Sequence, residues 1–188
     1  MTIVRGAGGA VRSGIRAELQ AIVPLDALEE QHIRDSLAWL DSGAELFRRE
    51  KPAVPPRHLV SYFALIDGDW ILLVDHINAG LWLPSGGHVE IGETPAGTVQ
   101  REVQEELGIA AEFLFPAPVF LTVTETVGMS AGHTDVSLWF ALKGSRAAPL
   151  DFDRTEFHGV KWFHRTDLPP RREPNLLRFL QKLAVLQA

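Results

Sequence analysis

The sequence contains no cysteine among its 188 residues, and this absence removes several kinds of chemistry. A chain without thiols forms no disulfide bond, binds no metal through thiolates and uses no cysteine nucleophile. Long hydrophobic runs are also missing, since no stretch approaches the roughly 20 apolar residues that a membrane-spanning helix requires. We therefore expect a protein without a membrane partner.

An excess of positive charge is absent as well, because 24 acidic residues outnumber 18 basic ones and give a net charge of −6. A dedicated nucleic-acid-binding protein would show a basic patch, so we expect no nucleic-acid partner. Arg5, Arg12 and Arg16 precede the first acid, Glu18, but this segment lacks the apolar core of a secretion signal. A cytoplasmic location is the default expectation.

The length and composition fit one ordinary globular domain with a real hydrophobic core, with 46% hydrophobic and 22% charged residues. Pro52, Pro55 and Pro56 mark a linker. The sequence therefore predicts an N-terminal helical extension over residues 1–50 and a main domain over residues 51–188.

The extension carries two helical patterns. A first helix is expected over 13–23, after a glycine-rich start at 1–11 that we expect to be loosely packed. A second helix starts at Asp26, a cap residue, and ends near Gly43, with a short helical turn around 46–47. The extension would cap a site, form a dimer arm or add packing. We favour packing or dimerisation, so a homodimer is a possible assembly.

The main domain reads as a mixed sheet between helices. Strands are predicted over 58–66 and 70–74, joined by an Asp67-Gly68 turn. Both strands are nearly apolar on both faces, which is typical of a sheet covered on both sides. Further strands are predicted at 80–83, 112–115, 119–127, 136–143 and 157–163. A C-terminal helix begins at Pro174, with a core side formed by Leu176, Leu177, Leu180 and Leu183.

A glycine loop at Gly86 and Gly87 feeds one strongly marked helix. Thr94 can cap this helix, Pro95 suits its first position and Gly108 ends it. Its apolar residues recur at helical spacing and form one stripe, made of Ala96, Val99, Val103 and Leu107.

Acidic residues crowd the neighbouring face of the same helix. Glu102, Glu105 and Glu106 stand three and four residues apart, a spacing at which like charges cost roughly 0.2–0.5 kcal/mol per pair. A solvated acidic face is the simplest interpretation of such a run. These acids, however, lie beside the apolar stripe, which indicates a partly buried cluster. Clustered carboxylate oxygens suit a hard divalent cation, Mg²⁺ or Mn²⁺.

These residues resemble the signature of the Nudix hydrolases. That signature reads Gly, five residues, Glu, seven residues, Arg-Glu, an aliphatic residue, any residue, Glu-Glu, any residue, Gly and an aliphatic residue. Every position is matched, by Gly87, Glu93, Arg101, Glu102, Val103, Glu105, Glu106, Gly108 and Ile109. Since each fixed residue type has a background frequency of only about 5–10%, a chance match is very improbable.

The resemblance implies the Nudix fold, a mixed β-sheet between helices (α/β/α), over 51–188. It also implies Mg²⁺-dependent hydrolysis of a nucleoside diphosphate linked to another group. By the same resemblance, Glu102, Glu105, Glu106 and the Gly86 carbonyl are metal ligands, Glu102 is also a candidate catalytic base, and Glu93 orients Arg101 or supports the metal shell.

Other candidate site residues lie outside the helix. Glu156, on a late loop, resembles the glutamate that binds metal or deprotonates water in some Nudix enzymes, and a surface carboxylate is an equal alternative. His88, His133 and Asp135 are candidates for substrate contact, although a loop histidine is more often only exposed. Trp82, like Phe63 and Trp139, could stack on a nucleobase, although aromatic residues in strands usually belong to the core.

The substrate stays open at this stage. The partner is expected to be a small-molecule nucleotide, with a weak preference for a nucleoside triphosphate. Alternatives are an ADP-ribose or sugar-nucleotide pyrophosphatase and a non-catalytic nucleotide-binding module. An isopentenyl diphosphate isomerase of the same fold is disfavoured, because those enzymes use a catalytic cysteine and this chain has none.

Overall fold

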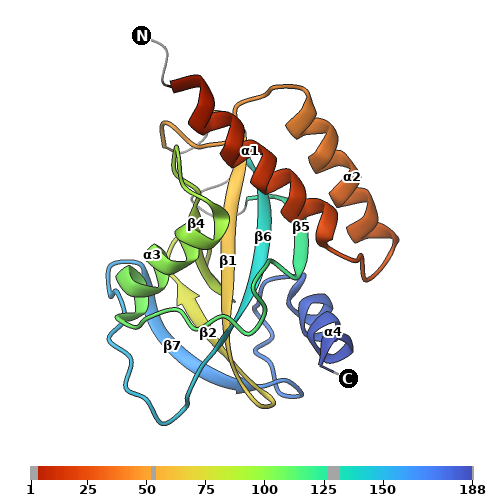
Figure 1. The fold of residues 1–188 in the computed structure, drawn as a ribbon. Coiled ribbons are helices and arrows are strands. Elements are labelled where there is room, and N and C mark those ends of the chain that lie inside the picture. Colours follow the sequence, from red (N-terminus) through yellow and green to blue (C-terminus); the bar gives the residue numbers. More distant parts are fainter. Residues whose placement is uncertain (1–3, 52–53, 127–131, 188) are drawn as a thin grey trace.

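The computed structural model describes residues 4–51, 54–126 and 132–187, which form four helices and seven strands (Figure 1). Within these ranges no helix is both long and apolar enough to cross a lipid bilayer. In chain order the elements are α1 (Val4–Ala21), α2 (Ala27–Asp41), β1 (Arg57–Asp67), β2 (Trp70–His76), β3 (Leu81–Leu83), β4 (Ser85–His88), α3 (Pro95–Leu107), β5 (Phe120–Glu125), β6 (Thr134–Lys143), β7 (Phe157–His164) and α4 (Leu176–Leu186).

The strands form one mixed sheet with β1 at its centre. The order is β3-β2-β1-β6-β5, while β4 also pairs with β1 and β7 also pairs with β2. The β1–β6 pair is parallel, and the other strand pairs are antiparallel. This confirms the predicted α/β class with a mixed sheet.

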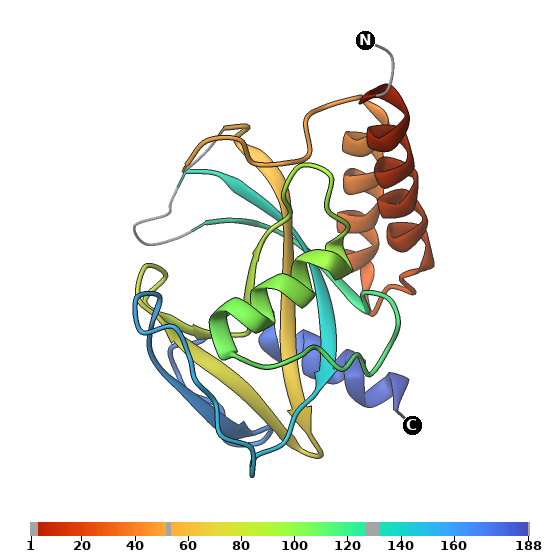
Figure 2. The ribbon, with the colours of Figure 1, turned by 60° about the vertical axis from the view of Figure 1, so that its left-hand side comes forward.

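Helices cover both faces of the sheet, as the apolar strands predicted. On β1, Phe63 and Leu65 belong to the core cluster that includes the apolar side of α3, whereas Ala64 and Ile66 belong to the cluster under α4. Neighbouring residues of a strand point to opposite faces, so this alternation places α3 and α4 on opposite sides of β1. Figure 2 shows the two helices on either side of the strand.

The N-terminal prediction was wrong about where α1 begins. The helix starts at Val4, inside the glycine-rich segment that was expected to be loosely packed. Ile15, Leu19 and Ile22 are buried in the core shared with the sheet. Burial of Ile15 and Leu19 stabilises the second half of α1, from which the helix extends back through the glycine-rich segment.

The start of α2 was predicted correctly, because Asp26 Oδ1 accepts a hydrogen bond of 2.9 Å from the Glu29 N–H. The short helical turn expected around residues 46–47 does not form. Instead, Leu46 is buried, and its carbonyl accepts a hydrogen bond from the Leu59 N–H. Pairing with β1 therefore replaces a local helical bond.

Several strand limits differ from the prediction. Residues 85–88, expected to form a loop, make strand β4 against β1. The strand expected at 112–115 is reduced to a single bridge between Phe113 and Leu142, which the nearby prolines explain. β5 ends at Glu125, and Val127, the last residue of the expected strand, lies outside the described residues.

The C-terminal helix begins at Leu176, two residues after Pro174. Its predicted core side was partly wrong, because Leu177 is 44% exposed and Phe179 is fully buried. Phe179 packs against Trp139, with ring centroids 5.1 Å apart. The buried side of α4 therefore includes Phe179 and not Leu177.

Candidate active site

Local sequence signals set the limits of helix α3. Thr94 Oγ1 accepts a hydrogen bond of 3.1 Å from Gly97 N–H, and Pro95 occupies the first turn. Gly108 ends the helix with a φ of 67°, a left-handed conformation that suits glycine. The buried stripe of Val99, Val103 and Leu107 fixes the rotation of the helix. That rotation directs Glu102 and Glu106 towards strand β4.

The paired glycines of β4 allow the backbone to approach closely. A Cβ atom on Gly87 would overlap the Glu102 carboxylate, and one on Gly86 would overlap the Ser61 carbonyl and Tyr62. Only glycine fits at position 86, where the overlap includes backbone atoms, whereas a side chain at position 87 would displace the Glu102 carboxylate. The signature glycine is therefore explained by the carboxylate that lies against it.

Glu106 is the most buried acid of the helix, with 5% of its surface exposed. The Ser85 hydroxyl and the Gly86 N–H donate hydrogen bonds to its carboxylate. Burial, together with the negative charges of Glu102 and Glu156, raises the pKa of Glu106 to about 9, although the two hydrogen bonds act in the opposite direction. A group in this position is neutral at pH 7 unless a cation neutralises its charge.

Glu102 is the second buried acid of this site. Burial raises its pKa, which the pairing with Arg101 partly offsets. Arg101 Nη1 lies 2.7 Å from Glu102 Oε1 and 3.2 Å from Glu105 Oε2. The Glu105 side chain is 59% exposed, so it lies at the outer rim of the acidic group.

Arg101 and Glu93 form a two-pronged ion pair beside the acids. Arg101 Nε donates to Glu93 Oε1 at 2.8 Å, and Nη2 donates to Oε2 at 3.0 Å. This pair, together with hydrogen bonds from Thr98 and the Glu90 N–H, lowers the pKa of Glu93 to about 2. Arg101 also donates to the His88 carbonyl at 3.3 Å, so it connects α3 to the end of β4.

Glu156 lies in the turn before β7, where it is exposed. Its backbone carbonyl accepts a hydrogen bond of 2.9 Å from Ile77 N–H, which fixes the turn beside β2. Its charge raises the pKa values of both Glu102 and Glu106. The fold thus brings the late-loop glutamate within electrostatic range of the helix carboxylates.

His88, His133 and Asp135 lie together in a second polar group, which also includes His58, a residue that the sequence reasoning missed. The group lies on one face of the sheet where β1, β4 and β6 meet. Burial, together with the positive charges of Arg48, His58 and His133, lowers the pKa of His88 to about 2. The sequence feature that could have identified His58 is its place as a polar residue at the start of an otherwise apolar strand.

The aromatic residues considered for base stacking differ in how deeply they are buried. Trp139 and Phe63 are buried in the core, and Trp139 Nε1 donates a hydrogen bond of 2.9 Å to Thr122 Oγ1. Trp82 is half-buried and meets the Phe163 ring edge-on, with centroids 5.0 Å apart. The Trp82 carbonyl also accepts a hydrogen bond from the N–H of Glu173, a buried acid that the sequence reasoning did not single out.

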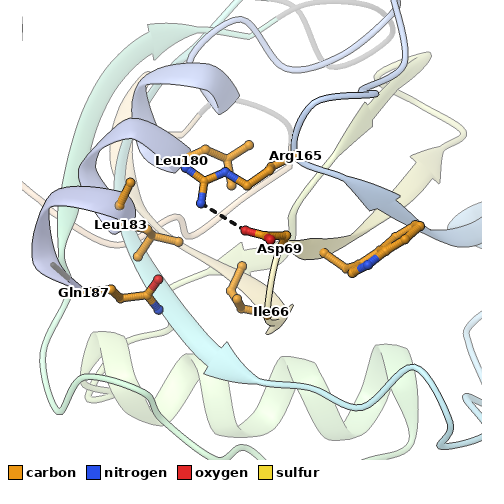
Figure 3. Close-up of a pocket in the computed structure, with 9 residues that line it drawn as sticks. Ile66, Asp69, Arg165, Leu180, Leu183 and Gln187 are labelled. Carbon is orange, nitrogen blue, oxygen red and sulfur yellow. Dashed lines mark hydrogen bonds and ion pairs between the residues drawn. The ribbon is translucent and has the colours of Figure 1, made fainter.

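A hollow in the molecule lies apart from these acids. It lies between α4 and the β1–β2 turn, lined by residues that include Asp69, Arg165 and Leu180 (Figure 3). Its volume is about 20 Å³, which is room for about one water molecule. This hollow is too small for a nucleotide, and neither it nor the open hollow of about 460 Å³ beside it is lined by any of the signature acids.

The mixed sheet covered by helices on both faces defines a class of α/β protein, and its helix α3 carries two buried carboxylates, Glu102 and Glu106. The family of the chain follows from comparison: a model of the NUDIX domain matches residues 56–183, so this chain belongs to the Nudix family and is a hydrolase that acts on pyrophosphate bonds. Members of this family generally use divalent metal ions.

Solved structures share this fold at low sequence identity. A MutT NUDIX hydrolase from Burkholderia pseudomallei is 24% identical, with a TM-score of 0.55 over 68% of this chain and 98% of that one. The dihydroneopterin triphosphate pyrophosphohydrolase of E. coli is 18% identical, with a TM-score of 0.54 over 77% and 100%. The NUDIX domain of NrtR from Shewanella oneidensis, complexed with ADP ribose, is 18% identical, with a TM-score of 0.55 over 75% and 95%.

Proposed function

We propose that this protein hydrolyses a nucleoside diphosphate-linked compound with the help of Mg²⁺ or Mn²⁺. The observation that carries the proposal is the burial of Glu102 and Glu106 side by side against β4, where burial raises the pKa of both acids and the charge of Glu102 also raises the pKa of Glu106. Two acids that disfavour each other's ionised form become a strong cation site when a divalent ion is present.

The proposed ligands are Glu102, Glu105, Glu106 and the carbonyl of Gly86. All of them offer oxygen atoms, which is the donor set that Mg²⁺ prefers. The absence of a side chain at Gly87 supports this fit, because a Cβ atom there would displace the Glu102 carboxylate. A bound ion would neutralise the charge of the diphosphate, which otherwise could not approach an acidic surface.

The remaining residues would accept a proton from the attacking water or keep other side chains in position. The oxygen of water forms a bond to phosphorus while the bond from phosphorus to the bridging oxygen breaks. The water proton goes to a carboxylate, and Glu156 and Glu102 are the two candidates. Glu93 would act as a positioning residue by holding Arg101 between the acids.

The proposed substrate is a nucleoside triphosphate, with ADP-ribose or a sugar nucleotide as the alternative. The fold relatives support both, because one is named for a triphosphate and another binds ADP ribose. The intact signature disfavours a non-catalytic module. Substrate contact by His88, His133, Asp135 and Trp82, like the cytoplasmic location and the homodimer, stays a prediction.

The test is product release from a panel of substrates, measured with Mg²⁺ and with chelator: phosphate or pyrophosphate from nucleoside triphosphates, and the nucleotide products from ADP-ribose, sugar nucleotides and dinucleotides. We expect chelator-sensitive turnover of one substrate class. Glu106→Gln should abolish that turnover while leaving the metal-free fold intact or more stable. Full activity of this variant would remove the proposed metal site, and silence of the wild-type protein across the panel would favour a binding role.

A further inference from the structure

A second group of potential metal ligands lies outside the carboxylate helix. Among the described residues, one set of three or more histidine and acidic side chains brings its ligand atoms within 4.8 Å of one another. We propose that this set, His58, His88, His133 and Asp135, binds a transition-metal ion, with Zn²⁺ as the best fit, at a site separate from that of Glu102 and Glu106.

The strand pairing explains why these four side chains meet. His58 on β1 is the register partner of Asp135 on the parallel strand β6, so both side chains project from the same face of the sheet. His88 on β4 is opposite Val60, two residues after His58, and therefore shares this face. His133 lies two residues before Asp135. Four residues from three chain segments are thus placed by backbone pairing alone.

The distances match a tetrahedral metal site. Asp135 Oδ1 lies 3.3 Å from His58 Nε2 and 3.3 Å from His133 Nε2. Ligands that bind zinc at about 2.0–2.1 Å in a tetrahedron stand roughly 3.3–3.4 Å apart. The ligand atoms of the whole set lie within 4.8 Å of one another, so the more distant side chains would move only slightly to surround an ion.

The hydrogen bonds orient the ring nitrogens for a cation. His58 Nδ1 lies 2.8 Å from the Pro55 carbonyl, which only accepts, so Nδ1 carries the proton and Nε2 presents a lone pair. His133 Nδ1 is engaged by the Thr126 hydroxyl at 3.2 Å, and its Nε2 also faces Asp135. Bonding the outer ring nitrogen to an oxygen is how proteins orient metal-binding histidines.

The atoms that face the centre of this group have no hydrogen-bond partner. His58 Nε2, His88 Nε2 and Asp135 Oδ1 are buried and unpartnered, and His58 is fully buried. Buried polar atoms are normally satisfied, so three unpartnered atoms around one point support a cation site. A proton shared between Asp135 and one histidine is the competing explanation, and it would satisfy the group without any metal.

The donor set separates this site from the carboxylate site. Three imidazole nitrogens and one carboxylate oxygen suit Zn²⁺ and its transition-metal neighbours, whereas Mg²⁺ prefers oxygen ligands alone. The two sites are nevertheless neighbours, since the charge of Arg48 interacts with both Asp135 and Glu102. A metal here would connect β1 and β6 to β4, which is the strand that carries Gly86 and Gly87.

The experiment measures the metal content of the full-length protein after incubation with Zn²⁺ in a large excess of Mg²⁺, followed by desalting. We expect one equivalent of Zn²⁺. His58→Asn should lose it, because the Asn amide can still donate to the Pro55 carbonyl while Nε2 is gone. His158→Asn, the same change at an exposed histidine, should keep it. Glu106→Gln should also keep it while losing hydrolytic activity, which separates this site from the proposed catalytic one.

A second readout covers the case in which His58→Asn does not fold, as judged by circular dichroism. Wild-type protein loaded with Co²⁺ in excess Mg²⁺ should show the strong visible bands of tetrahedral Co²⁺, and Asp135→Asn should change them. Weak octahedral bands, zinc binding that survives His58→Asn in a folded protein, or zinc binding that disappears in Glu106→Gln would each overturn the proposal.

Discussion

At the scale of single residues, the same side chain behaves differently according to what surrounds it. Arg101 holds the pKa of Glu93 down to about 2, while burial raises the pKa of Glu106 to about 9. The two acids are only thirteen positions apart in one signature. The sequence identifies both as acids of the site, but their ionisation depends on tertiary contacts that spacing alone does not reveal.

Glu156 offers the clearest kinetic test at this scale. If Glu156 accepts the water proton, Glu156→Gln should lower kcat about 10²–10⁴-fold with little change in substrate affinity. Steady-state kinetics on the substrate found by the panel would measure both values. Glu125→Gln, a matched change at an exposed glutamate, should leave kcat unchanged. An unchanged kcat in Glu156→Gln would return the role of base to Glu102.

Glu173 gives a prediction about pH and stability. Burial raises its pKa to about 7, and its Oε2 atom has no partner. Because the folded protein holds this proton more tightly than the unfolded chain, the stabilisation is complete below about pH 4.5 and is lost as the pH rises through 7. The slope is at most about 1.4 kcal/mol per pH unit. Glu173→Gln should therefore flatten the fall in unfolding free energy between pH 5 and 7.

Urea unfolding at several pH values would measure this effect, with Glu125→Gln as the exposed control. The control should keep the wild-type slope. If Glu173→Gln kept that slope as well, the assignment of the pH dependence to the buried carboxyl would be wrong.

At the scale of elements, helix α3 was predictable and strand β4 was not. The ends of α3 are set by local signals, Thr94 with Pro95 at one end and Gly108 at the other, and the structure has them in place. Strand β4 contains two glycines, which favour a loop on propensity, and it forms because β1 pairs with it. His58 was missed for the same reason, since only strand register brings it to Asp135.

Gly87→Ala tests the contact between these two elements. The new methyl group would overlap the Glu102 carboxylate and displace it from the site. We expect hydrolysis to fall at least about tenfold, equal to a loss of 1.4 kcal/mol in transition-state binding, with the far-ultraviolet spectrum unchanged. Gly159→Ala is the matched control, because a methyl group there meets nothing within 4 Å. Equal activity of both variants would show that Glu102 is free to move without consequence.

At the scale of the whole molecule, the N-terminal extension is part of the core. Ile15, Leu19 and Leu40 lie in the same buried cluster as the sheet residue Phe63. The sequence predicted two helices here but placed the first one too late, because the gain from packing on a distant sheet is not visible in a glycine-rich segment. Packing was one of the two roles favoured for the extension, and the buried cluster agrees with it. Dimerisation and the domain division at residue 51 stay predictions.

One buried ion pair connects this extension to the C-terminal helix. Lys182 Nζ on α4 lies 2.6 Å from Glu29 Oε1 on α2, and both residues are almost fully buried. Glu29 also accepts hydrogen bonds from the backbone N–H groups of Leu25 and Leu121. The pair therefore joins α2, α4 and strand β5 at one point in the interior.

Lys182→Ala should destabilise the protein by about 3–5 kcal/mol, because it leaves a buried carboxylate without its counterion. Lys143→Ala removes an exposed ion pair with Glu112 and should leave the stability almost unchanged, because solvent screens the two charges. The double variant Glu29→Gln with Lys182→Met should recover much of the loss, since neither charge then remains buried. Urea denaturation would give all three values. Equal losses for Lys182→Ala and Lys143→Ala would mean that the buried pair contributes no more to stability than an exposed one.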